Sequence, residues 1–240
     1  MTPLVLSLLA LYGQNPDTTK PYTLPPTTVT VTRSDQPLTK VPLSAHSVGH
    51  AEISRAKPTW GLDEALASVP GVYVANRYNF SQDQRISIRG FGARSAFAVR
   101  GIKILVDGIP QTLPDGQGQL TNLELGEVDR IEVLRGSASA LYGNASGGVI
   151  SIWTSAERTA HINEEARVEA GRFDEGSERT WNKWQTTTGF PVGSGGSARL
   201  TVSRLDYAGE RDHSAADSRV LNGRIHLRVW IVEDADARQV

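Results

Sequence analysis

The last third of the chain alternates strictly between apolar and polar residues. Three stretches carry apolar or small side chains at every second position: Ala166, Val168 and Ala170; Ala198, Leu200 and Val202; and Leu221, Gly223, Ile225, Leu227 and Val229. A further stretch has Trp181, Trp184 and Phe190 near its ends. A period of two residues places the apolar side chains on one face of a β-strand. The pattern predicts about four antiparallel strands over residues 156–240.

Two kinds of sheet produce this alternation. A transmembrane β-barrel turns its apolar face to lipid, whereas a soluble antiparallel sheet buries that face in a core. Residues 156–240 have room for about four strands at roughly ten residues each, and a membrane barrel needs about eight strands to close. We therefore expect either a soluble sheet or the opening strands of a barrel in an N-terminal fragment, and we favour the fragment.

Residues 44–155 have a shorter and mixed pattern. A helix is predicted from Thr59 to Val69, with Thr59 as its cap and Pro70-Gly71 as its end. An Ala-rich run between Leu134 and Gly143 predicts a second, short helix. Apolar and β-branched runs separated by glycine-bearing turns predict strands at residues 72–75, 85–89, 103–106, 130–134 and 149–153. The region has the pattern of a small α/β domain.

The N-terminal region, residues 1–43, differs in composition from residues 44–155 and from residues 156–240. Residues 1–13 contain an apolar block about as long as the core of a secretory signal peptide, so we expect a signal peptide there. Residues 14–43 carry six prolines and have the composition of a flexible linker. Within that linker Thr28, Val29, Thr30, Val31 and Thr32 form a β-branched run, which favours an extended strand. Such a run suits either an ordinary edge strand or strand addition to another protein.

Composition narrows the function classes. The net charge is −1, which argues against a generally basic nucleic-acid-binding surface. The chain has no cysteine, and its five histidines form no zinc-binding pattern, so we expect neither a metal site nor a resident cofactor. Phosphate-binding loops, dinucleotide fingerprints and hydrolase nucleophile motifs are absent from the sequence. We therefore expect a protein that is not an enzyme.

Four motifs in a fixed order give a more specific indication. They are residues 86–92 (ISIRGFG), 105–110 (LVDGIP), 128–136 (VDRIEVLRG) and 140–150 (ALYGNASGGVI). With these motifs the chain resembles the plug domain of TonB-dependent outer-membrane receptors. The resemblance covers residues 27–155 strongly and residues 156–240, as the opening barrel strands, more weakly. It implies an α/β plug, a small mixed sheet with short helices, followed by the first antiparallel strands of a transmembrane β-barrel.

The resemblance also implies a function and partners. Such receptors sit in the outer membrane of Gram-negative cells, with the plug on the periplasmic side of the barrel lumen and lipid around the barrel. They import a scarce solute, such as a ferric siderophore or an organic cofactor, using energy delivered by TonB. Residues 28–32, hereafter the box segment, lie where the family's TonB box should lie. TonB would add a strand to this segment and pull on it.

Further roles follow by position in the family's motifs. Arg89, Glu132 and Arg135 are expected to form a charged lock between plug and barrel, with barrel partners beyond residue 240. Outward plug loops are expected to contact the solute through Arg77, Tyr78, Asn79, Phe80, Gln82, Arg94, Phe97, Gln111, Asp115 and Gln117. Residues 91–95 and 114–119 resemble a subgroup in which import of pyrroloquinoline quinone is one known role. The alternative is a soluble periplasmic module that carries a plug-like domain and a short sheet.

Overall fold

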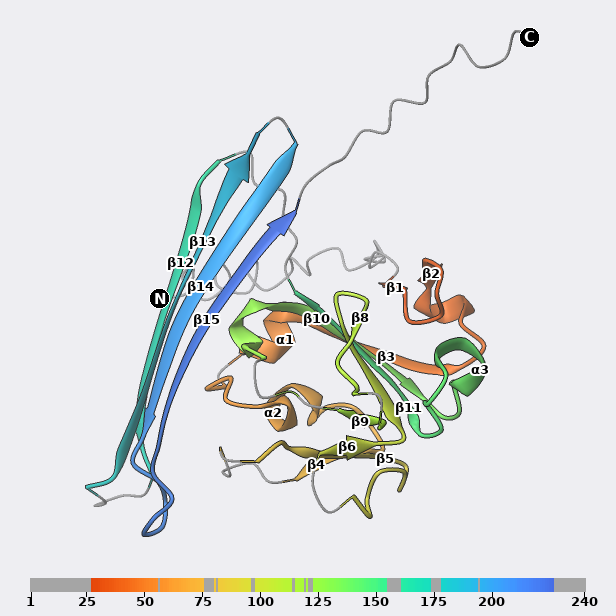
Figure 1. Ribbon diagram of the computed structural model, residues 1–240, viewed down its shortest axis with the longest axis horizontal. Coiled ribbons are helices and arrows are strands. Elements are labelled where there is room, and N and C mark those ends of the chain that lie inside the picture. Colours follow the sequence, from red (N-terminus) through yellow and green to blue (C-terminus); the bar gives the residue numbers. More distant parts are fainter. Residues whose placement is uncertain are drawn as a thin grey trace, which may run out of the picture.

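The computed structural model describes residues 27–55, 57–75, 80, 82–95, 98–113, 115–118, 120, 123–154, 161–173, 178–193 and 195–226. The chain forms an α/β domain beside a tall four-stranded antiparallel sheet (Figure 1). The expected signal peptide, residues 1–13, and the linker up to residue 26 lie outside the described residues. Among the described residues, no helix is both long and apolar enough to span a bilayer.

A mixed five-stranded sheet organises the α/β domain. Its order is β3-β10-β11-β7-β8, and β11 and β7 are its only parallel neighbours. The central strand β10 pairs with β3 on one side and β11 on the other. The strands are β3 (Ser44–Gly49), β7 (Ile102–Val106), β8 (Ile109–Pro110), β10 (Val128–Arg135) and β11 (Gly148–Thr154).

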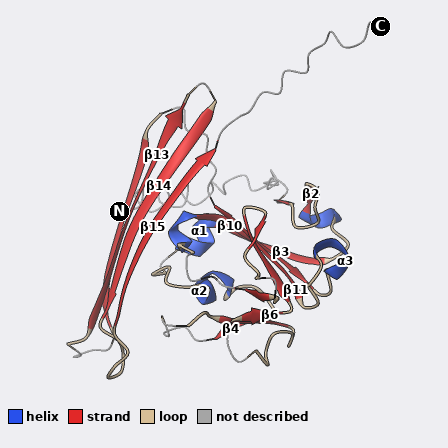
Figure 2. Ribbon diagram, viewed as in Figure 1, coloured by secondary structure: helices blue, strands red, loops and turns tan. Residues whose placement is uncertain are grey.

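The main core lies on one face of that sheet. Alternate residues of β7, β10 and β11, such as Ile104, Ile131 and Ile152, are fully buried there. Two short helices and two small two-stranded sheets cover them, as Figure 2 shows. These elements are α1 (His50–Ser54), α2 (Leu62–Leu66), the pair β4 (Val72–Ala75) and β5 (Arg85–Ile88), and the pair β6 (Val99–Arg100) and β9 (Gln117–Gly118). A short 3-10 helix, Leu125–Glu127, leads into β10.

The opposite face of the sheet carries the N-terminal segment. Here β1 (Thr28–Val29) pairs with β2 (Gln36–Pro37), followed by a 3-10 helix at Leu38–Lys40. Val29 and Val31 pack into a second apolar cluster with Leu105, Leu134 and Val149, beside α3 (Ser139–Tyr142). A flexible linker was expected through residue 43, but residues 27–43 are instead folded onto the domain. Their β-branched side chains bury apolar area against the sheet, which offsets the entropy lost by the chain.

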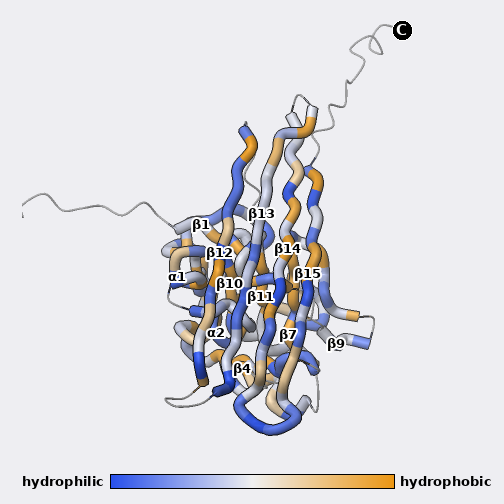
Figure 3. Tube along the Cα trace, turned by 90° about the vertical axis from the view of Figure 1, so that its left-hand side faces the viewer, coloured by the Kyte–Doolittle hydropathy of each residue, from blue (hydrophilic) through white to orange (hydrophobic). Residues whose placement is uncertain are grey.

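The four-stranded sheet is formed by β12 (Asn163–Arg172), β13 (Thr180–Val192), β14 (Gly196–Tyr207) and β15 (Ala216–His226). Neighbouring strands are antiparallel along their full length. Val168, Trp184, Leu200, Leu221 and Ile225 are exposed on the side away from the α/β domain. Figure 3 shows orange and blue alternating along β14 of this sheet.

The inner face of this sheet is mostly polar, apart from Leu205 and Tyr207 near one end. Lys183, Gln185, Thr187, Thr201 and Ser203 are buried, and Lys183 and Ser203 contact the α/β domain directly. This arrangement inverts the soluble sheet, in which the apolar face would be buried. Apolar-out and polar-in is the arrangement of a transmembrane barrel wall. The ambiguity left by the alternation is therefore decided in favour of the barrel-like sheet, which is open in the described chain.

The predicted strands of both regions are present, but the first helix is shorter than expected. The sequence predicts Thr59 to Val69 with Thr59 as the cap, whereas α2 begins at Leu62 with Gly61 before it. The Glu64 carboxylate accepts the N–H groups of Thr59 and Trp60, and Gln84 accepts the N–H of Leu62. Gln84, rather than Thr59, therefore satisfies a donor of the first turn, and Thr59 lies before the helix with a φ of +52°.

Two neighbouring glycines allow a matched test of backbone packing. Gly90 and Gly92 have φ of +88° and +85°, but only Gly92 is crowded: a Cβ there would lie 2.5 Å from the Ile86 carbonyl oxygen. Gly90→Ala should cost about 1–2 kcal/mol of unfolding free energy for the left-handed backbone. Gly92→Ala should cost about 1–3 kcal/mol more, because it also overpacks the turn. Urea unfolding followed by tryptophan fluorescence measures both, and equal losses would contradict the crowding at Gly92.

Candidate functional site

The box segment is docked on the α/β domain. Val29 and Val31 are 0% and 1% exposed, and they insert into the apolar recess formed by Leu105, Leu134 and Val149. Only Thr28 and Val29 are in a strand, and their partners are Pro37 and Gln36 of β2. A β-branched run was expected to be extended, and the structure shows extension only in its first two residues.

Glu132 holds the next two residues. Its carboxylate oxygen Oε2 accepts the backbone N–H of Thr30 and the backbone N–H of Val31, both at 2.8 Å. The Thr30 hydroxyl lies 3.3 Å from the same oxygen. The Arg130 Nε donates to the other oxygen, Oε1, at 2.9 Å. The side chain of Glu132 is fully buried, so these charge-assisted hydrogen bonds replace its hydration.

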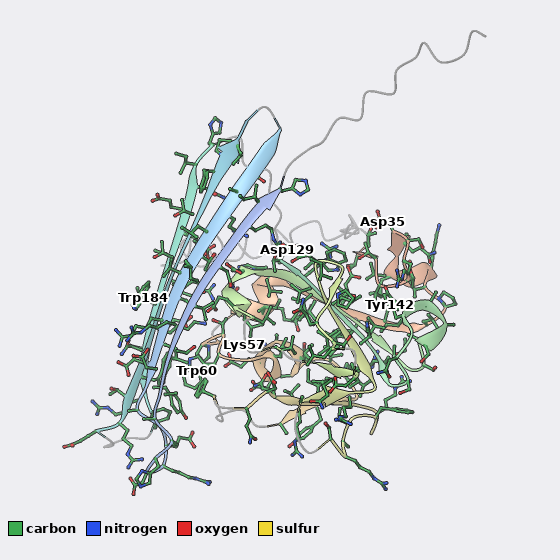
Figure 4. The ribbon with its side chains drawn as sticks, viewed as in Figure 1. Asp35, Lys57, Trp60, Asp129, Tyr142 and Trp184 are labelled. Carbon is green, nitrogen blue, oxygen red and sulfur yellow. The ribbon has the colours of Figure 1, made fainter. Side chains whose placement is uncertain are left out.

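Tyr142 holds the carbonyl side of the same segment. Its hydroxyl donates to the Val31 carbonyl oxygen at 2.7 Å, and the Arg33 guanidinium lies 4.4 Å above its ring. Burial raises the pKa of the Tyr142 hydroxyl above its ordinary value; Arg33 opposes that rise and the Glu132 carboxylate adds to it. The hydroxyl therefore remains protonated at neutral pH and available as a donor. Figure 4 shows Tyr142 beside the N-terminal segment that carries Asp35.

The two arginines of the expected lock meet at one turn. The Arg135 Nη1 donates to the Pro70 carbonyl at 2.7 Å, and the backbone N–H of Arg89 donates to the Gly71 carbonyl at 2.8 Å. The Arg89 guanidinium also reaches the Ser44 hydroxyl at 3.2 Å. The Arg135 Nε is buried without a hydrogen-bond partner among the described residues. Both arginines thus lie at the Ser44 end of β3, the end far from β12–β15 in Figure 1.

Glu132 is not grouped with those arginines. It was expected to join them in the lock, but its hydrogen bonds go to the box segment and to Arg130. The reason is the alternation along β10: Glu132 and Arg135 are an odd number of residues apart, so their side chains leave the strand on opposite faces. The described contacts of Glu132 are therefore those of a docking group for the N-terminal segment.

The expected solute-contact residues are only partly brought together. Arg77, Tyr78, Asn79 and Phe97 lie outside the described residues. Phe80 and Gln82 line a cavity between the α/β domain and the four-stranded sheet. The other four lie away from this cavity: Arg94 is exposed in the turn after β5, Gln111 follows β8, and Asp115 accepts the backbone N–H of Gln117 in β9.

That cavity has a volume of about 820 Å³ and an aromatic rim. Trp60 packs edge-on against Trp181 and Tyr207, with ring centroids 4.7 and 5.3 Å away. Phe80 and Phe173 pack against the same Tyr207 ring. Figure 4 shows Trp60 pointing from the α/β domain toward the sheet, whereas Trp184 lies on the sheet's outer side. The sequence marked the two tryptophans of β13 but not their contact with Trp60, which is distant in the chain.

A buried ion pair joins the domain to the sheet below this rim. The Lys183 Nζ lies 2.7 Å from Glu124 Oε1, and the two side chains are 6% and 5% exposed. Lys183 also donates to the Thr59 carbonyl at 2.8 Å, and the Ser203 hydroxyl donates to Glu124 Oε2 at 2.6 Å. None of these residues is among those predicted from the sequence. The available signal was a lysine in phase with the polar face of a predicted strand.

A second group of polar contacts lies nearer the other end of the sheet. Asp107, in the turn between β7 and β8, accepts the backbone N–H of Thr154 at 2.9 Å and binds the Arg224 guanidinium of β15. Asn222 of the same strand donates to Glu127 at 3.1 Å. In the contacts of Asp107 and Glu127 with β15, the domain supplies the carboxylate and the sheet supplies the cation or amide.

The described residues contain no cluster of His, Asp and Glu side chains that could hold a metal ion. Three carboxylates among them make structural contacts instead. Glu132 binds the box segment, and Glu124 and Asp107 bind cations of the four-stranded sheet. The arrangement can therefore hold an N-terminal segment, a packed domain and a strand wall together, with an aromatic-rimmed cavity at one end.

Comparisons with known proteins agree with this architecture. The family model for the TonB-dependent receptor plug domain matches residues 37–149. The vitamin B12 transporter BtuB of Vibrio vulnificus is 30% identical over 55% of this chain and 21% of its own length. The ferric enterobactin receptor of Pseudomonas aeruginosa is 31% identical over 52% of this chain and 18% of its own. The chain spans about a fifth of the length of these two relatives.

Solved structures extend the likeness into the four-stranded sheet. The siderophore receptor PirA of Pseudomonas aeruginosa superposes with a TM-score of 0.57 and 26% identity, over 78% of this chain and 32% of that one. Because the matched share exceeds that of the α/β domain alone, the four-stranded sheet takes part in the similarity.

The buried ion pair yields a stability prediction. Lys183→Met should lower the free energy of unfolding by about 3–5 kcal/mol, because it leaves the Glu124 carboxylate buried without its cation. Adding Glu124→Gln should recover much of that loss, since the uncompensated charge is removed. Arg219→Met removes a cation from a solvent-exposed pair with Asp217 and should have little effect. Chemical unfolding of the four proteins measures this, and equal effects of Lys183→Met and Arg219→Met would contradict it.

Proposed function

We propose that the chain belongs to the TonB-dependent receptors, whose plug-domain model matches residues 37–149, and that it forms the plug and first wall strands of an outer-membrane receptor that imports a scarce solute. In this proposal the α/β domain is the plug, the four-stranded sheet is part of the barrel wall, and TonB supplies energy through the box segment. The receptor catalyses no reaction. Its partners are TonB, the solute and the lipid around the barrel.

The observation that carries the proposal is the inverted polarity of the four-stranded sheet. Its polar face meets the plug through Lys183 and Ser203, while Trp184, Leu200 and Leu221 are exposed on the far side. Apolar side chains on a sheet face stabilise the folded protein only when they are removed from water. A bilayer provides that environment, and the polar side then lines the lumen that the plug fills.

The connections between the strands support an orientation. Residues 193–195 join β13 to β14, whereas the connections at the other end span residues 173–179 and 208–215. Outer-membrane barrels have short turns on the periplasmic side and longer loops outside. The aromatic-rimmed cavity would then face the outside, since His213 to Val220 line it. The box segment lies toward the short-turn end in Figure 1, which would put it within reach of TonB in the periplasm.

The cavity suits a planar or aromatic solute. Trp60 and Phe80 offer ring faces, and Gln82 and His213 offer hydrogen-bonding groups. Ferric siderophores and organic cofactors such as pyrroloquinoline quinone both have this chemistry. The names of the similar proteins, a vitamin B12 transporter and receptors for siderophores, support a solute of the same general kind. Arg77, Tyr78, Asn79, Phe97, Arg94, Gln111, Asp115 and Gln117 remain proposed contacts from further plug loops.

For Arg89 and Arg135 we retain the lock as part of this proposal. Both lie at the end of the plug far from β12–β15, where further wall strands would complete a barrel. The unpartnered Nε of Arg135 supports a carboxylate on such a strand, because a buried guanidinium N–H without an acceptor is costly. The soluble periplasmic module fits less well, since it would leave a broad apolar sheet face in water.

The lock predicts a leak. In the intact receptor, Arg135→Ala should raise solute-independent conductance in planar bilayers, because the plug loses a charged anchor to the far wall. Arg89→Ala should act in the same direction. Arg100→Ala is the matched control, because that arginine is exposed on β6. Conductance equal to that of the control in both variants would argue against the lock.

The coupling to TonB predicts a separation of uptake from binding. Val31→Pro removes a backbone donor that an added strand needs, so uptake should be lost while solute binding at the cell surface is retained. Val31→Ala keeps the N–H and should retain most uptake. Radiolabelled ferric siderophores, cobalamin and pyrroloquinoline quinone, tested one at a time, serve as probes. Equal loss of binding and uptake in Val31→Pro would overturn the assignment of residues 28–32 as the TonB box.

A further inference from the structure

We propose that Arg204 and Arg219, on the outward face of the four-stranded sheet, form a binding site for the phosphate group of a lipid in the outer leaflet of the membrane. This inference rests on the proposed function, in which the outward face meets the bilayer. It adds the headgroup chemistry that this part of the wall recognises.

The outward face of the sheet changes from apolar to charged along two neighbouring strands. On β14, Leu200 is followed on this face by Val202 and then by Arg204, because Thr201 and Ser203 between them are buried on the inner face. On β15, the exposed Leu221 is separated by one residue from Arg219. Both changes occur toward the end of the sheet that carries the longer connections. The proposed orientation places that end outside the cell.

A tryptophan marks the same level of the sheet. Trp184 of β13 lies directly opposite Arg204, and Arg204 lies directly opposite Arg219. Trp184 is on the outer side of the sheet, as Figure 4 shows. Tryptophan is enriched where the hydrocarbon of a membrane meets its headgroups. The row therefore places the two guanidinium groups beside lipid headgroups.

The register also settles on which face Arg219 lies. Arg219 borders the aromatic-rimmed cavity at the open edge of β15. Residues directly opposite one another in an antiparallel pair share a face of the sheet, and Arg204 is flanked by the inward-facing Ser203 and Leu205. The side chains of both arginines therefore leave the sheet on the outward face.

The two arginines are like charges that face each other, an arrangement that destabilises a strand pair. Asp217 bridges them in part. It accepts from Arg204 Nη2 at 2.9 Å, and from Nε and Nη2 of Arg219 at 3.2 and 3.0 Å. Each guanidinium carries five N–H donors, so these three hydrogen bonds leave most donors for another acceptor. The Arg204 Nε has no hydrogen-bond partner among the described residues.

A lipid phosphate matches this arrangement in charge and in shape. A guanidinium fork binds two phosphate oxygens at once, and an anion between the two arginines offsets their repulsion. The acyl chains of the same lipid would cover Leu200 and Leu221 on the adjoining apolar face. A free phosphate ion gains nothing from that face. The combination of paired arginines and an apolar face therefore favours a phosphate that is attached to acyl chains.

The test measures lipid binding to the intact receptor in detergent by native mass spectrometry. The probe is dioleoyl phosphatidic acid, and EDTA is present to remove divalent cations. Arg204→Gln and Arg219→Gln should each weaken binding roughly tenfold, because each removes charge-assisted hydrogen bonds. Arg100→Gln is the matched control, since it removes an exposed arginine from β6 of the plug, and it should leave the affinity unchanged. Equal affinity of all four proteins would overturn the proposal.

Two further arms identify the ligand. Dioleoylglycerol has the same acyl chains without the phosphate, and it should bind the parent no better than phosphatidic acid binds the double arginine variant. Inorganic phosphate in excess should leave most of the phosphatidic acid bound. Its complete displacement would show that free phosphate is the ligand and would overturn the assignment to a lipid.

Asp217→Asn tests the sign of the electrostatics. It removes a carboxylate that repels phosphate and that occupies three arginine N–H groups, so the affinity for phosphatidic acid should rise roughly threefold. A loss of affinity would show that the carboxylate, rather than the arginine pair, recognises the headgroup. The proposal would then be wrong.

A separate measurement distinguishes this inference from the proposed function. The chain has no cysteine, so a spin label can be attached at Leu221→Cys in the intact receptor in lipid vesicles. The label should collide more often with oxygen, which enters the bilayer, than with a water-soluble nickel chelate. If it does, and the arginine variants bind phosphatidic acid like the parent, this inference fails and the proposed function stands. A water-exposed label would overturn the wall assignment and the lipid site together.

Discussion

The polarity of the four-stranded sheet sets the conditions for the rest of the structure. Because its inner face carries Lys183, Gln185 and Thr187, the α/β domain cannot meet it through an ordinary hydrophobic core. Beside the aromatic contacts of Trp60 with Trp181 and Tyr207, the two parts meet through polar groups that must satisfy one another, since each unpaired buried charge would be costly. Glu124 pairs with Lys183, and Asp107 pairs with Arg224. The apolar outer face has the complementary requirement and needs an apolar surrounding.

The central sheet of the α/β domain connects these contacts with the N-terminal segment. One side of this sheet packs against the main core, and the other side packs against Val29 and Val31. Glu132 points from β10 to the second face, whereas Glu124 and Asp107 lie in connections at the side of the four-stranded sheet. The groups that dock the box segment are therefore separate from those that hold the domain to the sheet.

Much of the fold could be predicted from the sequence because its determinants are local. The strands at residues 72–75, 85–88 and 148–154 follow β-branched runs bounded by glycine turns. The helix before them was predicted too long, because the donor at its first residue, Leu62, is satisfied by Gln84, which is 22 residues further along the chain. Local pattern predicts which segments become strands or helices. It does not predict which distant side chain satisfies a helix end.

The candidate site could likewise be predicted only in part, because some of its contacts join residues that are far apart in the chain. The position of the box segment was predicted from a β-branched run, but its docking was not, because Glu132 and Tyr142 are more than one hundred residues away in the chain. Of the predicted solute-contact residues, Phe80 and Gln82 line the cavity, whereas Arg94 and Gln111 lie elsewhere. Glu132 was grouped with Arg89 and Arg135 by motif alone. Alternation along β10 separates it from Arg135, and only the pairing of strands shows what each face meets.

By itself, the sequence determined the order of the elements, the family motifs and the period of two residues in the last four strands. These are properties of neighbouring residues, which sterics, turn chemistry and side-chain alternation govern directly. The tertiary structure decided which face of each strand is buried, which ions pair and where the N-terminal segment lies. Those outcomes depend on groups far apart in the chain, whose desolvation is favourable only once folding has brought the correct partners together.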